Sequence, residues 1–189
     1  MKQLIFVCAF LMISYCALSQ SKAEEVCAAI NKYFSEVEKG GQLDRIKGSL
    51  FAPAKYNGTI AQEFSATENF PLAQTTTLVD TSQKAGNPYR KIKALMLKET
   101  LDSDGLSANM QKIFSAFDIA FRNCLLPQKY NYVGPADQVI KLHKAESSFT
   151  KSIGRGYRTD EHLHANIYVE QTKKEDKYIH ELYIVLSRG

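Results

Sequence analysis

Two stretches of the chain carry apolar residues at the three- and four-residue steps of an amphipathic helix. The first follows a capping box formed by Ser21 and Glu24, has Cys27, Ile30, Phe34 and Val37 on one stripe, and precedes Gly40-Gly41. The second follows Ser107, ends before Pro127, and has these residues on one face: Met110, Ile113, Phe114, Phe117, Ala120, Phe121 and Cys124. We expect a helix at each.

Strand-like segments lie between the two helices. Asn57-Gly58 is typical of a two-residue hairpin turn, and residues 74–80 are rich in β-forming residues. Residues 89–98 contain Ala, Leu, Met and Lys, which favour helix locally, but turn signals at 86–88 and 102–105 enclose the segment. We therefore predict a strand there. Further strands are predicted after the second helix, at 129–133, 138–144 and 147–153.

The chain ends in a predicted β-hairpin. Leu163, Ala165, Ile167 and Val169 alternate with polar residues, and the partner strand, 177–187, carries apolar residues at the same period. A four-residue loop at 173–176 would place residue 172 opposite 177. This register predicts Leu163 opposite Leu186 and Ile167 opposite Leu182, and it places His180 opposite Val169.

These elements predict an α+β fold. We expect an antiparallel β-sheet with two helices packed on one face, in the order helix, about three strands, helix, three to five strands. The order suggests a doubled helix-plus-three-strand unit, although the residues of the two halves do not match.

Residues 1–19 are typical of a cleaved secretory signal peptide, with Lys2 before an apolar run and small residues near Ala17 and Ser19. The rest, 20–189, is then a single α+β domain that is periplasmic or secreted, as in many small exported bacterial proteins. A lipoprotein anchored at Cys16 is the alternative, but the bulky Tyr15 departs from that signal. No later segment has the apolar length of a transmembrane span.

Export leaves Cys27 and Cys124 as the cysteine pair of the mature chain. Cysteine pairs in oxidising compartments are usually bridged. Cys27 lies early in the first predicted helix and Cys124 late in the second, so antiparallel packing of the helices would bring them together. We predict a disulfide between them.

The histidines do not form a predicted metal site. His162 and His164 share one strand face, whereas His180 lies on the next strand and points to the other face. His180-Glu181 begins like a zinc-protease motif, but Ile184 stands where that motif needs histidine. Residues 102–105 resemble part of a calcium loop, without the acidic ligands at its first and last positions. We expect no metal and no cofactor.

The formal net charge of +4 gives little reason to expect a nucleic-acid partner. Basic residues nevertheless gather in the segments 84–98 and 141–158, which would form a basic face if they were neighbours in the sheet. The loop 154–160 places Arg155 and Arg158 beside Tyr157, a trio suited to an anionic group. An anionic glycan, a lipid head group or an acidic protein are the candidate partners. The oligomeric state is open.

The resulting hypothesis is a non-catalytic exported binding or interaction module for an anionic or macromolecular partner. Two alternatives belong to other classes. One is a hydrolase that assembles its site from distant residues, with His162 or His164 as the base. The other is a carrier that holds a small apolar ligand between the helices and the sheet.

Overall fold

The structure is a computed structural model, and it describes residues 24–35, 46–56, 59–80, 90–134, 145–153 and 162–188. The predicted signal peptide, the strand predicted at 138–144 and the loop 154–160 lie outside these residues. Within them the order is helix, four strands, helix, four strands, which confirms the α+β class.

The two helices are residues 24–35 and α2 (Ala108–Leu125), which continues into the 3₁₀ helix η2 (Leu126–Gln128). No helix in the described ranges has the length and apolar character needed to cross a bilayer. The strands are β1 (Lys47–Tyr56), β2 (Thr59–Ala66), β3 (Thr75–Asp80), β4 (Arg90–Leu101), β5 (Asn131–Val133), β6 (Glu146–Ser152), β7 (His162–Lys174) and β8 (Lys177–Arg188).

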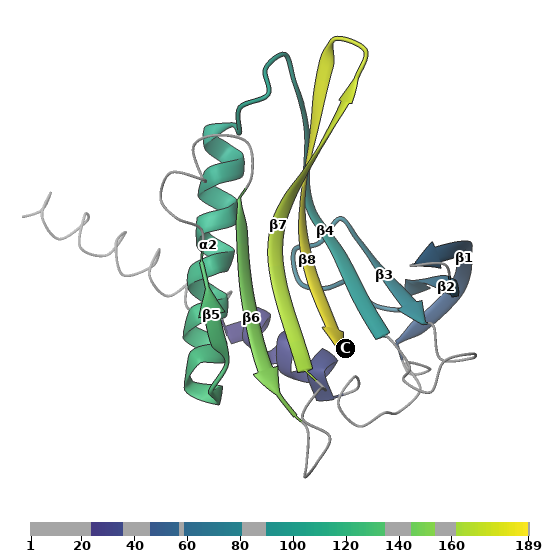
Figure 1. Cartoon of the computed structure of the whole chain (residues 1–189), viewed down its shortest axis with the longest axis vertical. Coiled ribbons are helices and arrows are strands. Elements are labelled where there is room, and N and C mark those ends of the chain that lie inside the picture. The colour runs from purple at the N-terminus through teal and green to yellow at the C-terminus, as the bar shows by residue number, and fades with distance from the viewer. Residues whose placement is uncertain are drawn as a thin grey trace, which may run out of the picture.

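All eight strands form one antiparallel sheet in the order β1-β2-β3-β4-β8-β7-β6-β5 (Figure 1). Each half of the described chain therefore supplies a helix followed by four consecutive paired strands, against about three predicted for the first half and three to five for the second. The halves join where β4 pairs with β8, at the middle of the sheet. Tyr56 pairs with Thr59, which confirms the hairpin predicted from Asn57-Gly58. These two turn residues themselves lie outside the described ranges.

Strand β4 forms despite its helix-favouring composition because it pairs along both edges, with β3 and with β8. A β-bulge near its middle reverses the alternation of its side chains. Lys93 lies opposite Val185 and Lys98 lies opposite Glu181, so both lysines point to the same face although an odd number of positions separates them.

The hydrophobic core lies between the two helices and one face of the sheet. Ser107 caps α2 as predicted, and its Oγ accepts a hydrogen bond from the Met110 N–H at 2.9 Å. The largest fully buried side chains come from both helices, the sheet and the segment before β3: Ile30, Phe70, Leu78, Ile92, Met110, Phe114, Phe121, Leu125, Phe149, Leu163 and Ile167. This packing gives the sheet an inner face against the helices and an outer face opposite them.

The C-terminal hairpin has the predicted faces but not the predicted register. Leu163 lies opposite Arg188, Ile167 opposite Ile184, and Val169 opposite Leu182, a shift of two residues. The strands pair as far as Lys174 and Lys177, so the turn has two residues instead of four. A shift of two keeps every side chain on its face, and for this reason the hydrophobic pattern could not distinguish the two registers.

The predicted disulfide between Cys27 and Cys124 is present. The helices meet differently from the antiparallel packing that was expected. Along the first helix, Asn31 accepts a hydrogen bond from Gln128 Nε2 and the ring of Phe34 stacks on Tyr130. The contacts therefore lead past the C-terminal end of α2 and not back along it.

We predict that the Cys27→Ala/Cys124→Ala variant is less stable by about 2–5 kcal/mol, because the bond links residues 97 positions apart and restricts the unfolded chain. Urea denaturation of the variant and of the oxidised and reduced wild type provides the measurement. Reduced wild type should unfold at nearly the same urea concentration as the variant. Equal unfolding free energies for oxidised protein and variant would contradict the structural role of the bond.

Candidate functional site: the outer face of the sheet

The outer face carries a cluster of tyrosines, lysines and carboxylates over β4, β8, β7 and β6. Two valines of this face, Val79 and Val185, are buried, and Val185 lies between Lys93 of β4 and Asn166 of β7 among the accessible groups. These groups are Lys93 and Lys98 from β4, Glu181 and Tyr183 from β8, Asn166, Tyr168 and Glu170 from β7, and Glu146 from β6.

Two tyrosines form the centre of this cluster. Tyr168 and Tyr183 are directly opposite each other on β7 and β8, and their ring centroids are 5.7 Å apart. Both side chains are partly exposed. Aromatic cross-strand pairs stabilise a sheet, and they also present a rigid apolar surface to a ligand.

Lysines from β4 reach this pair from the other half of the chain. Lys93 Nζ lies 3.6 Å from the centroid of the Tyr183 ring and 3.4 Å from Glu170 Oε2. Lys98 Nζ lies 2.7 Å from Glu181 Oε1. These pairs are partly exposed, so each contributes modestly to stability. Their main effect is to fix the positions of the tyrosine and glutamate side chains.

The environment changes the acidity of two groups in the cluster. Burial raises the pKa of Tyr183, and the hydrogen bond that its hydroxyl donates to Glu181 at 2.9 Å raises that pKa further. Burial alone would raise the pKa of Glu181, but hydrogen bonds from Lys98 and Tyr183 outweigh it and hold that pKa below its ordinary value. Tyr183 is therefore a neutral donor to a charged acceptor across the whole physiological range.

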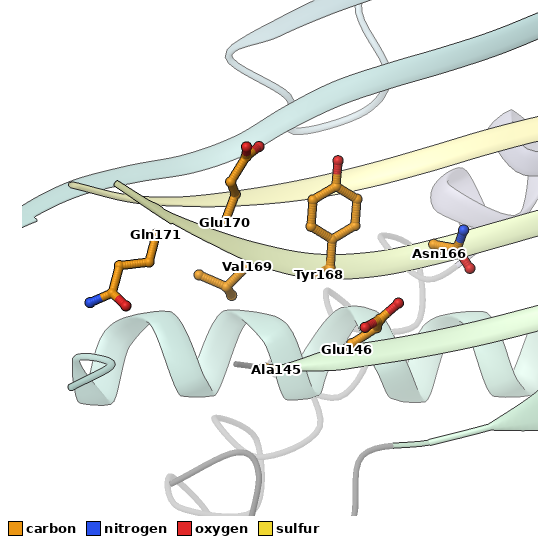
Figure 2. A pocket seen from close by; sticks show the side chains of 7 residues that line it. All are labelled: Ala145, Glu146, Asn166, Tyr168, Val169, Glu170 and Gln171. Atoms are coloured by element: carbon orange, nitrogen blue, oxygen red, sulfur yellow. The ribbon is translucent and has the colours of Figure 1, made fainter. Parts of the chain in front are cut away.

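A cavity of about 570 Å³ lies beside Tyr168, within the size range of small-molecule and side-chain pockets. In Figure 2 the side chains of Glu146, Asn166, Tyr168 and Glu170 rise from the sheet away from α2. Val169, Gln171 and Ala145 complete the described lining. Strand β6 begins at Glu146, which pairs with Tyr168, and β7 continues beyond this pair. The cavity therefore extends to the edge of β7.

The basic face that the sequence suggested does not form in the described residues. Strands β4 and β6 carry basic residues from the two segments, but β8 and β7 lie between them. Lys93 and Lys98 are paired with glutamates, and Lys151 points to the inner face, with its Nζ 5.4 Å from the centroid of the Tyr130 ring. The predicted binding trio Arg155, Tyr157 and Arg158 lies outside the described residues, as does the rest of the loop 154–160.

The histidines occupy opposite faces, as predicted. His162 and His164 lie on the outer face, where His164 Nδ1 is 3.4 Å from Thr150 Oγ1. Burial lowers the pKa of His164, and the neighbouring His162 lowers it further. His180 is fully buried on the inner face, and neither of its ring nitrogens has a hydrogen-bond partner among the described residues. Within the described ranges, no three His, Cys, Asp or Glu side chains come together as metal ligands.

Sequence reasoning missed the tyrosine pair. The register predicted for the hairpin placed Tyr168 opposite Glu181, and only the observed register places it opposite Tyr183. The alternation of β7 did indicate that Tyr168 and Glu170 share the polar face. No protein-family model, curated protein or solved structure matches the chain, so the site itself carries the functional argument.

Replacing Glu181 with glutamine should lower the pKa of Tyr183 toward its ordinary value, because the variant loses a charged acceptor. The pKa should remain above that value, since burial persists. The ¹³Cζ shift of labelled tyrosine, followed from neutral to alkaline pH, measures it. Glu175→Gln, at the hairpin turn, is the matched control and should change nothing at Tyr183. An unchanged pKa in the Glu181 variant would contradict the bond.

We also predict that the purified protein binds no stoichiometric zinc. Gln171, which lies opposite His180, is seven residues along β7 from His164, about 23 Å at the usual strand rise. The side chains also point to opposite faces, so the three histidines cannot meet at one ion. Elemental analysis after dialysis against zinc tests this. One zinc per chain that disappears in His164→Ala would contradict it.

Proposed function

We propose that this protein is an exported, non-catalytic binding module that engages a macromolecular partner through its outer face. The observation that carries the proposal is the partly exposed Tyr168–Tyr183 pair beside the cavity. Tyrosines are enriched at protein interfaces because they bury a large area at a small cost in conformational entropy. Here the lysines and carboxylates around them hold the rings in position before a partner arrives.

Two other features support an exported interaction protein. The disulfide between Cys27 and Cys124 is consistent with an oxidising compartment, where the predicted signal peptide would direct the chain. Both helices pack on the inner face, where their apolar side chains form the core. The outer face can therefore vary its side chains for binding without disturbing that core.

The geometry of the outer face also argues against the other candidate partners and functions. Glu146 and Glu170 line the cavity, so an anionic glycan, a lipid head group or an acidic protein is disfavoured at this place. The cavity lies at the edge of β7 and takes its charged lining from the outer face, whereas a carrier of an apolar ligand would hold it between helices and sheet. Among the described residues, His164 has Thr150 as its hydrogen-bond partner, and a hydrolase would also need a group that orients the imidazole.

Site-specific photo-crosslinking tests this proposal. A photoreactive phenylalanine analogue replaces Tyr168, and in a separate variant Tyr178, in the organism that makes the protein. Tyr178 is the matched control, a partly buried tyrosine of β8 near the hairpin turn. We expect a covalent adduct of defined mass from position 168 and none from 178. Absence of an adduct at 168, or equal adducts at both positions, would contradict binding through the outer face.

A further inference from the structure

The described lining of the cavity is acidic, although the chain as a whole has a formal net charge of +4. Glu146 is exposed, and its carboxylate forms no ion pair within the part of the chain that the structure describes. Glu170 has Lys93 on one side, yet its side chain is 51% exposed. The two carboxylates lie on neighbouring strands on the outer face, and Glu146 is directly opposite Tyr168. A cation brought to this place would find two carboxylates and an aromatic side chain.

The outer face already holds one cation between an aromatic ring and a carboxylate. Lys93 lies over the ring of Tyr183 and beside the carboxylate of Glu170, so an ammonium group, a tyrosine ring and a carboxylate pack together on this surface. Tyr168 packs beside Tyr183 with its ring tilted by 38° and continues the same aromatic surface into the cavity. The chemistry that orders the cluster from within is therefore also suited to a cation supplied from outside.

We propose that the partner places an arginine side chain in this cavity, against Tyr168 and between the carboxylates of Glu146 and Glu170. The inference rests on the proposed function and names the group that the outer face recognises. A guanidinium suits the site better than an ammonium because it is planar, stacks on aromatic rings and donates to two acceptors at once. The amide oxygen of Asn166, which lines the cavity on the same face as Tyr168, offers a further acceptor.

A pair of small probes that differ in charge tests the inference. Nα-acetyl-arginine amide is titrated into the ¹⁵N-labelled oxidised protein, and Nα-acetyl-citrulline amide, its neutral isostere, is the comparison. We expect saturable shifts of the amide signals of Glu146, Asn166, Tyr168 and Glu170, with a dissociation constant in the millimolar range. Citrulline amide should bind about tenfold more weakly, since it lacks the charge that strengthens the hydrogen bonds.

Two variants complete the experiment. Glu146→Gln should weaken binding of the arginine probe severalfold, and Glu175→Gln, an exposed carboxylate at the hairpin turn, should leave it unchanged. Equal affinity for the two probes, or shifts that cluster elsewhere, would overturn the arginine proposal. Crosslinking from Tyr168 without arginine binding would overturn this inference alone. Failure of both experiments would overturn the proposed function as well.

Discussion

The pairing of β4 with β8 is the constraint on which the rest of the structure depends. It is the junction in the sheet between the strands of the first half and those of the second, and it runs from Arg90 opposite Arg188 to Leu101 opposite Tyr178. On the inner face it aligns Ile92 with Leu186 inside the core. On the outer face it brings Lys93 from one half onto Tyr183 of the other. Core and candidate site therefore depend on the same set of backbone hydrogen bonds.

The β-bulge in β4 determines which face of the sheet the charged side chains of this strand point to. Without it, Lys93 and Lys98 would point to opposite faces, and one of them would enter the core without a partner. With it, both lysines reach glutamates on the outer face. Glu99 then points inward, where its carboxylate accepts hydrogen bonds from Ser107 and Asn109 at the start of α2. A single β-bulge thus places the paired lysines on the outer face of the sheet and the carboxylate that holds the start of α2 on its inner face.

Much of the fold could be predicted from local patterns, because burial acts on each element separately. The stripe on α2, its cap at Ser107 and the alternation of β7 all follow from nearby residues, whereas the disulfide was predicted because Cys27 and Cys124 are the cysteines that follow the predicted signal peptide. Strand adjacency and strand register, which relate one segment to another, could not be predicted from local patterns. The adjacency of β4 and β8 has no local signal, and a two-residue shift in the final hairpin leaves every side chain on the same face of the sheet. That shift decides whether Tyr168 faces Glu181 or Tyr183, and it therefore concealed the centre of the candidate site.

The central claim is that the outer face around Tyr168 is the surface covered by a partner. Hydroxyl-radical footprinting of the protein in extracts of its own organism, compared with the purified protein, measures this directly. We expect the oxidation of Tyr168 and Tyr183 to fall in the extract, while Tyr178 and the exposed Ile119 of α2 react equally in both samples. Protection of Ile119 with undiminished oxidation of Tyr168 would place the binding surface on the helices and contradict the account.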